Sequence, residues 1–506
     1  MKNLIVIFFT FLIGLSQARG QSDTSIKSQI DTAIVLVKSG KHLSAAQKLL
    51  FLARTTNVAV AKPRIKYMLG LSLMELNLNQ IAAFQFVDVV RSGDVNWTKL
   101  ALEKLLIVTD KLGDETLLNF AIQRVEISQI PAKNREMLYY RLADIKHKAG
   151  QQEEAIPFYQ RVTSQSRYYY NALYNLGLAQ AELGQVDQAL LSFRKLLAAR
   201  SSAKVTDTNK VAAQMAIART YYQKEDWTRA IEAYAKIPRD HALWHAALFE
   251  KTWAMLRNAR FRSTLSNFQS LHSAYYDDAY LPETLLLRAI VYLYICQYDE
   301  MEKVLSLYES QYGPSFNKVT NFLKTSSLEE YFQEIHNTML IKAGEADGKV
   351  VSLPYNILKH ISAEGDVRRS YSYLKRIVDE KKLVEENDQI KSTLLGQYAG
   401  KLLTNRINST KAAIGSQVKR HLGNIKTELN DLSEQSGFIR YEMINGRKEL
   451  LKRKIEGKAV KAKLAQNEKQ DREFYIQNGY EYYPFQGEYW LDEIGNYHYL
   501  GKQSCE

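Results

Sequence analysis

Apolar and small residues recur between residues 29 and 311 at a spacing typical of paired amphipathic helices. The clearest example is Tyr170–Leu197, which predicts two amphipathic helices joined by a turn at Leu183-Gly184-Gln185. Gly177 on the first helix and Ala189 on the second are small, so the two helices can approach closely. Phe193 fills the space below this crossing. The stretch therefore predicts one helical hairpin.

The residue at the position of Ala189 recurs along the chain at steps of 37, 34, 39, 34, 41, 34 and 37 residues. In all eight predicted hairpins an aromatic or aliphatic residue follows four positions later. Turn signals such as Ala149-Gly150-Gln151 fall between the two helices of each predicted pair. The pattern predicts about eight hairpins over residues 29–311; the alternative is an irregular helical protein with chance periodicity. The recurring positions are Ala45, Ala82, Thr116, Ala155, Ala189, Ala230, Thr264 and Met301.

This spacing resembles the tetratricopeptide repeat, which has a small residue at position 8, Ala at 20, an aromatic at 24 and an apolar residue at 27. The resemblance implies an all-α fold, a right-handed α-solenoid of helical hairpins in which each repeat contacts only its neighbours. The 8 prolines and 24 glycines in 506 residues agree with a nearly all-helical chain.

Family members bind partners through a groove lined by positions 5 and 9 of the first helix of each repeat. Here these positions are mainly aromatic or aliphatic, so an apolar peptide or helix is the expected ligand. The Lys, Asn and Arg of a carboxylate clamp are mostly missing. The alternative is that the same side chains pack inside a tight superhelix or under the C-terminal segment. The candidate groove residues are Tyr140, Tyr174, Met215, Arg219, Phe249 and Trp253.

Beyond the repeats, Tyr312-Gly313-Pro314 predicts a helix break, and residues 316–410 predict a helical capping region. Residues 411–473 predict a long helix or coiled-coil arm, because an apolar seam runs at heptad spacing from Val418 to Leu464. The arm is either one helix or a hairpin broken near Ser436-Gly437, with residues 366–403 as a possible packing partner. Its basic end predicts either a solvated face or a docking surface for an acidic partner. The candidate basic residues are Arg447, Lys448, Lys452, Arg453 and Lys454.

Residues 474–506 predict an aromatic docking segment, because Tyr480–Tyr499 contains eight aromatic residues. This string resembles the C-terminal signature of envelope tetratricopeptide proteins associated with adventurous gliding motility machinery. Unlike the lipoprotein members, the chain has no lipid-attachment Cys near its start. The candidate docking residues are Tyr483, Phe485, Tyr489 and Trp490.

Residues 1–20 predict a secretory signal peptide, with Lys2 followed by the apolar stretch Leu4–Leu15, which is too short to span a bilayer. The alternative is an uncleaved anchor. The mature chain is therefore expected in the periplasm. Of the two cysteines, Cys296 lies on an apolar helix face and is expected to be a buried thiol; pairing with Cys505 is the alternative.

The net charge of +13 favours anionic partners such as cell-wall polymers or lipid headgroups, while export argues against nucleic acid. No catalytic, cofactor or metal constellation is found. His241 and His245 are one helical turn apart but lack a third ligand. We therefore expect a non-catalytic exported scaffold that binds another envelope protein, in a motility or envelope-assembly complex. The alternative is a peptidoglycan-binding or wall-remodelling accessory factor that uses the basic arm and aromatic tail.

Overall fold

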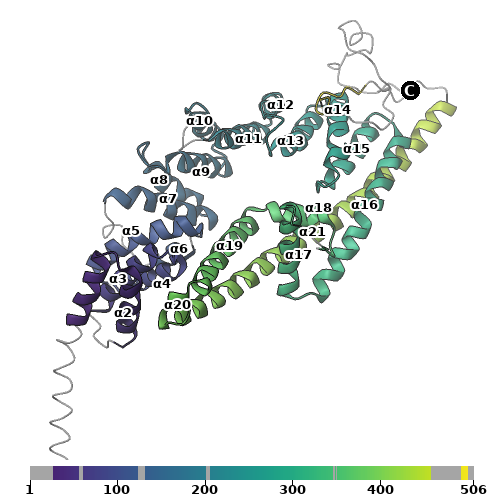
Figure 1. Ribbon diagram of the computed structural model, residues 1–506. Helices are drawn as coiled ribbons and strands as arrows, with labels where there is room; N and C mark the ends of the chain where they lie inside the picture. Colours follow the sequence, from purple (N-terminus) through teal and green to yellow (C-terminus); the bar gives the residue numbers. More distant parts are fainter. Residues whose placement is uncertain are drawn as a thin grey trace, which may run out of the picture. The chain divides into compact units, whose positions relative to one another are not determined.

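The computed structural model consists of helices and turns, and no described residue lies in a β-strand (Figure 1). Two compact units contain Met1–Leu138 with Gly365–Gly415, and Tyr139–Glu364 with Ser416–Glu506. The side chains of residues 132–134 and 454 are not described. The structure describes residues 27–55, 61–114, 116–122, 132–200, 206–345, 348, 350–456, 490 and 492–499.

In the first unit, helices that follow one another along the chain pack against one another, from α2 through α6. α19 returns to this group and contacts α4 and α5. The elements are a helix over residues 27–38, α2 (His42–Thr55), α3 (Lys62–Glu75), α4 (Asn79–Val90), α5 (Val95–Leu112), α6 (Thr116–Ile122), α19 (Gly365–Glu386), α20 (Asp388–Lys391) and the beginning of α21 (Leu394–Ile455).

In the second unit, consecutive helices from α8 to α16 also pack in pairs, and α17 packs on α18. Buried residues of α10 to α13 form one continuous apolar core, against which the partly buried Tyr174 and Leu178 of α9 pack. The elements are α7 (Ala132–Lys148), α8 (Gln152–Gln160), α9 (Tyr169–Glu182), α10 (Val186–Leu197), α11 (Asp207–Gln223), α12 (Trp227–Tyr234), α13 (Trp244–Arg257), α14 (Phe261–Leu271), η2 (Ala274–Tyr276), α15 (Glu283–Tyr294), α16 (Tyr298–Thr325), α17 (Leu328–Lys342) and α18 (Tyr355–Ala363), with the remainder of α21.

A residue in the left-handed backbone conformation separates the two helices of each hairpin. Such a residue ends a helix and lets the chain reverse, and glycine adopts the conformation at least cost. Four of the positions are glycine and four are not, and their φ angles lie between 53° and 76°. The positions are Gly40, Asn77, Gly113, Gly150, Gly184, Glu225, Ala259 and Cys296.

In all eight hairpins, the residue five positions after the left-handed residue is fully buried. In seven of them this buried residue is the recurring position predicted from the sequence, so the prediction is confirmed there. The third hairpin is the exception. Thr116 is exposed and Phe120 is 46% exposed, whereas Leu118 is completely buried. The prediction at Thr116 was therefore wrong by two residues, because Gly113 sets the start of the second helix there.

Close helix crossings depend on the small residue of the first helix. At Gly177 an added Cβ would lie 2.5 Å from the Phe193 ring, and at Gly70 it would lie 2.6 Å from the Phe86 ring. The aromatic ring thus occupies the space that the missing side chain leaves. This is the packing that the sequence pattern of small and aromatic residues predicts.

The predicted break at Tyr312-Gly313-Pro314 is wrong, because α16 continues through Pro314 to Thr325. Proline removes one helical hydrogen bond. Burial of Tyr308, Tyr312 and Val319 on the packed face of the helix offsets that loss.

α21 is one helix of 62 residues, without a break at Ser436-Gly437. Within the second unit its apolar seam is buried, with Val418, Leu422 and Leu429 at most 1% exposed. This part of α21 contacts α16, where the Tyr308 hydroxyl donates to the Leu429 carbonyl at 3.3 Å, and it also contacts Tyr280, whose hydroxyl donates to Glu428 at 3.0 Å. In the described part of the chain, no helix is long and apolar enough to cross a membrane. The predicted signal peptide lies outside the described residues.

Candidate partner-binding surfaces

The candidate groove residues lie on the first helices of four successive hairpins in the second unit, α7, α9, α11 and α13. Tyr140, Tyr174, Phe249 and Trp253 are each partly exposed. They occupy the groove-lining positions of their helices. The surface of these repeats is therefore formed by partly buried aromatic rings.

The tyrosines of this set are held by other rings. Tyr140 stacks on Tyr168 with 5.4 Å between the ring centroids, and Tyr174 packs against Phe193 at 5.9 Å. Such contacts fix the ring orientations at low entropic cost. These residues therefore belong partly to the repeat packing and partly to the surface.

Met215 does not contribute to the surface, since it is only 2% exposed and belongs to the core. Arg219, one turn further along α11, is exposed and forms a bidentate ion pair with Glu250 of α13, at 2.8 and 2.6 Å. The Tyr234 hydroxyl also donates to Glu250, at 3.0 Å. This pair links two neighbouring repeats across the predicted groove.

Two further side chains of this region were missed by the sequence pattern. Burial raises the pKa of Glu283, and a hydrogen bond from Trp253 opposes part of that rise. Burial lowers the pKa of Lys251, which lies between Phe249 and Trp253 in the sequence but lines a separate cavity with α14 and the C-terminal segment. Neither position stands out in the sequence, because the repeat pattern does not specify them.

The basic end of α21 carries charged and apolar residues side by side. Arg447 pairs with Asp299 of α16 at 2.6 Å, and Arg453 pairs with Glu449 at 3.2 Å, while Lys448 and Lys452 are exposed. The Lys454 side chain lies outside the described residues. An apolar stripe accompanies these charges, with four residues between 54% and 87% exposed: Tyr441, Ile444, Leu451 and Ile455.

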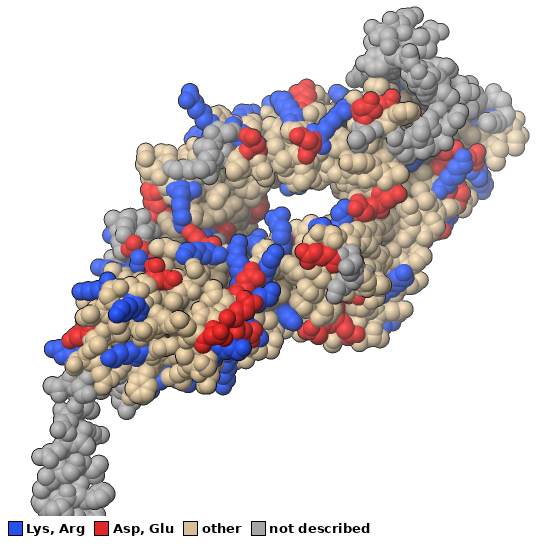
Figure 2. All heavy atoms as spheres, in the orientation of Figure 1, with Lys and Arg blue, Asp and Glu red and all other residues tan. Residues whose placement is uncertain are grey.

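Basic and acidic side chains are interspersed over the face in view in Figure 2, and the positive charge is not gathered into one patch there. The net charge of +13 is therefore a weaker guide to a binding site than the local geometry.

The described part of the C-terminal segment docks on the chain's own repeats. The backbone N–H groups of Gly495 and Tyr499 donate to the hydroxyls of Ser270 and Ser266 on α14, both at 2.7 Å. The Tyr499 hydroxyl donates to Gln297 at 2.9 Å, and Ile494 is 4% exposed.

Among the described residues, the contacts of this segment are made by Ile494, Gly495 and Tyr499, which were not among the four predicted docking residues. Trp490 is 62% exposed, and Tyr483, Phe485 and Tyr489 lie outside the described residues. Gly495 has a φ of 92°, and an added Cβ would lie 2.8 Å from Trp244, so glycine is needed at this contact. The aromatic count indicated a docking segment, but it could not identify Ile494 and Gly495.

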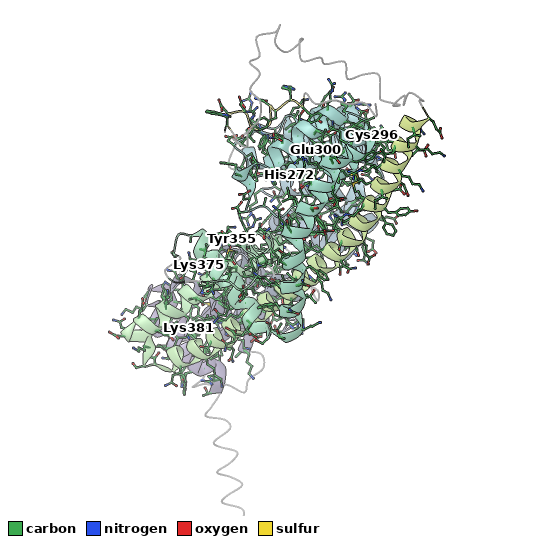
Figure 3. All side chains as sticks on the ribbon, turned by 90° about the vertical axis from the view of Figure 1, so that its right-hand side faces the viewer. His272, Cys296, Glu300, Tyr355, Lys375 and Lys381 are labelled. Carbon is green, nitrogen blue, oxygen red and sulfur yellow. The ribbon has the colours of Figure 1, made fainter. Side chains whose placement is uncertain are left out.

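His272, Cys296 and Glu300 lie on neighbouring elements at one end of the second unit (Figure 3). Cys296 is disulfide-bonded, so the expected buried thiol is wrong. Cys505, the other cysteine of the chain, lies outside the described residues. His272 is partly buried and shares a 2.8 Å hydrogen bond with the Thr284 hydroxyl, and burial lowers its pKa to about 3.

The histidine pair of α13 and its preceding turn has packing roles. His241 accepts a hydrogen bond from the Leu243 N–H at 3.1 Å, and His245 packs on Tyr276 with 4.2 Å between the rings. Burial lowers the pKa of His245 to about 4.

These helical hairpins, closed by left-handed turns and stacked through small residues, define a class of helical-repeat proteins that act as interaction scaffolds. Two tetratricopeptide repeat families match the chain, one over residues 138–169 and the other over residues 171–200. The chain therefore contains tetratricopeptide repeats. Proteins built on such repeats are generally non-catalytic interaction scaffolds.

One solved structure with a detectable likeness is a tetratricopeptide repeat protein from Parabacteroides merdae, at 15% sequence identity and a TM-score of 0.26. The likeness covers 57% of this chain and 93% of that one. This TM-score is too low to transfer any property from that protein. No functionally curated protein matches the chain.

Proposed function

We propose that the chain is a non-catalytic exported scaffold that holds another envelope protein in the groove of its fourth to seventh repeats. The observation that carries this proposal is the row of partly exposed aromatic side chains on α7, α9 and α13, interrupted by the Arg219–Glu250 pair. Half-buried aromatic residues provide contact area without a large loss of side-chain entropy. The fitting ligand is an amphipathic peptide or helix that places apolar residues on the rings.

Export is the second part of the proposal. It is supported by the predicted signal peptide over residues 1–20 and by the disulfide bond of Cys296, because disulfides persist in oxidising compartments. The resemblance of the aromatic tail to gliding-motility envelope proteins supports a motility or envelope-assembly complex as the setting. The basic end of α21 orients an acidic partner on the surface and raises the rate at which that partner associates.

The groove is tested by Phe249→Ser combined with Arg219→Ala, in a chain that carries an affinity tag in its native host. The partner recovered with the unmodified chain is expected to be lost. Leu191→Ser is the matched control, because Leu191 is 55% exposed on α10, a second helix that does not line the groove. Equal recovery by both variants, with unchanged helical circular dichroism, would refute the groove as the binding site.

Export is tested separately by fusing residues 1–20 to alkaline phosphatase, which is active only after secretion. Activity of the fusion that depends on the stretch Leu4–Leu15 is the expected result. An inactive fusion would refute export to the envelope. It would leave the test of the groove unaffected.

Peptidoglycan binding is the second candidate, favoured by the exposed Trp490 and the exposed Lys448 and Lys452. Aromatic faces stack on sugar rings, and lysines pair with wall carboxylates. Co-sedimentation with purified peptidoglycan, compared between the full chain and Trp490→Ala with Lys448→Ala and Lys452→Ala, decides this candidate. Sedimentation that does not depend on these residues would argue against it.

A further inference from the structure

A cavity of about 300 Å³ lies between α13, α14 and the docked C-terminal segment. Its walls carry basic and neutral polar side chains, and among the described residues that line it there is neither Asp nor Glu. The residues that matter for its chemistry are Lys251, Arg262, Ser263, Asn267, Asn496 and His498.

Lys251 is the central feature of this cavity. Among the described residues, no carboxylate forms an ion pair with its ammonium group; the adjacent Glu250 pairs with Arg219 instead. Burial lowers the pKa of Lys251, and no neighbouring charge offsets that burial. A partly buried ammonium without a counter-charge is costly, so a ligand that supplies the missing negative charge would gain binding energy.

The remaining walls add hydrogen-bonding groups to this charge. Arg262 brings a second cationic group from α14, one turn before Ser266. Arginine and lysine together provide a planar fork and a point charge, the two donor types that bind carboxylates and phosphates. Met255 supplies an apolar patch, so the cavity is suited to a small organic molecule as well as to a bare ion.

One wall is the C-terminal segment itself, which α14 holds through Ser266 and Ser270. Gly495, Asn496 and Tyr499 of the segment line the cavity. The cavity therefore exists only while the segment is docked. By linkage, any ligand bound there also stabilises the docked segment.

We propose that this cavity binds a small oxyanion, as a phosphate or carboxylate group, between the Lys251 ammonium and the Arg262 guanidinium. Its volume is at the lower end of the range for small-molecule sites, which admits a ligand of a few heavy atoms around one anionic group. Binding of the anion stabilises the docked C-terminal segment on α14. This inference is independent of the partner groove, which involves other residues.

The test is calorimetric titration of the full chain with inorganic phosphate, sulfate and acetate at constant ionic strength. Phosphate or acetate is expected to bind at one saturable site, and the preferred anion distinguishes the two ligand classes. Lys251→Met is expected to weaken binding at least tenfold. Lys236→Met is the matched control, an exposed lysine of the same unit outside the cavity, and it should bind as the unmodified chain does. The absence of saturable binding by any of the three anions, or equal loss in both variants, would overturn the proposal.

Two further readouts exclude a folding artefact. Since Lys251 is desolvated without a counter-charge, Lys251→Met is expected to melt at the same or a higher temperature than the unmodified chain. A lower melting temperature would show a structural role for the lysine and contradict the proposal. Hydrogen exchange at the amides of Gly495 and Tyr499 should slow on adding the preferred anion, and exchange that is unchanged at saturation would disprove the linkage to docking.

Discussion

The two compact units attach their later helices to the repeats by different means. In the first unit, the Glu380 carboxylate of α19 accepts hydrogen bonds from the backbone N–H groups of Gln80 at 2.8 Å and Ile81 at 3.2 Å. These N–H groups lie in the first turn of α4, whose N-cap residue makes no side-chain hydrogen bond to the helix. A helix of the repeats is thus capped by a residue 300 positions later in the chain.

More polar contacts surround that cap. The Tyr373 hydroxyl donates to Gln80 at 2.6 Å, and Arg406 of α21 donates to the Tyr373 hydroxyl at 2.6 Å and pairs with Asp114 at 3.2 Å. Every one of these groups is partly or fully buried. The attachment thus adds a buried polar network, in which each member depends on the next, to apolar contacts of α19 and α21 such as the fully buried Ile377 and Leu403.

In the second unit, α21 packs on α16 through an apolar seam, and its charged contacts lie outside the seam. Arg440 pairs with Glu309 at 2.6 Å and with Glu302 at 3.2 Å, and Arg447 pairs with Asp299. Gly446 allows the helix to approach Tyr298, where an added Cβ would lie 2.6 Å from the hydroxyl oxygen. The comparison indicates that burial of polar groups makes the first attachment sensitive to single changes, whereas the second distributes its energy over many apolar contacts.

The largest expected effect is that of Glu380→Ala. It leaves the N–H groups of Gln80 and Ile81 buried without an acceptor, and we expect a loss of about 3–5 kcal/mol at pH 5. Hydrogen exchange would show the loss as faster exchange of these amides, with the second unit unaffected. Glu386→Ala is the control, because this side chain is exposed on the same helix. Unchanged exchange in α4 would show that Glu380 does not cap it.

The same carboxyl predicts a pH dependence. Burial raises the pKa of Glu380 to about 7, although hydrogen bonds from the α4 backbone lower it in part. A raised carboxyl pKa means that the folded state binds the proton more tightly than the unfolded state. The free energy of unfolding should therefore fall as pH rises from about 4.5 to 7, by up to about 3 kcal/mol.

Urea denaturation at pH 5, 6, 7 and 8 measures this slope. Glu380→Gln keeps an acceptor oxygen and cannot ionise, so its curve should be flatter than that of the unmodified chain across the same window. Parallel curves for the two proteins would assign the pH dependence to other groups.

Sequence reasoning succeeded for the repeats because the same contacts recur locally. A small residue, a left-handed turn and a buried residue lie within about 13 positions of one another in each hairpin, as at Gly177, Gly184 and Ala189. The error at Thr116 shows the limit of a fixed interval. The buried residue always lies five positions after the left-handed turn residue. Counting from Gly113 would therefore have identified Leu118 in place of Thr116.

The attachments could not be predicted in the same way. Nothing near Glu380 in the sequence indicates that it caps α4, because the two partners are 300 residues apart. Similarly, Asn77, Glu225 and Ala259 adopt the left-handed backbone conformation although none of them is glycine. Tertiary packing, and not the residue type, therefore determines their φ angles. The predicted groove residues were found on successive repeats, but only the structure separates buried Met215 from exposed Arg219.

Leu429→Ala tests the apolar attachment. Leu429 is 1% exposed in the seam of α21, and its truncation is expected to cost about 2–3 kcal/mol, less than Glu380→Ala. Leu451→Ala is the matched control, because Leu451 is 54% exposed on the same helix and should change stability by less than about 0.5 kcal/mol. A loss at Leu429 as large as that at Glu380 would remove the contrast between the two attachments.

The smallest effect is expected for Arg440→Ala, although Arg440 contacts two glutamates. Glu302 and Glu309 are 41% and 54% exposed, so water and salt screen their attraction to the guanidinium. We expect a loss under about 1 kcal/mol, and less at 1 M salt than at 0.1 M. Arg440→Lys should recover part of the loss, because it keeps the charge but not the fork that reaches both carboxylates. A loss above about 2 kcal/mol that does not respond to salt would mean that the ion pairs, and not the seam, hold α21 on α16. The second attachment would then depend on polar groups as the first one does.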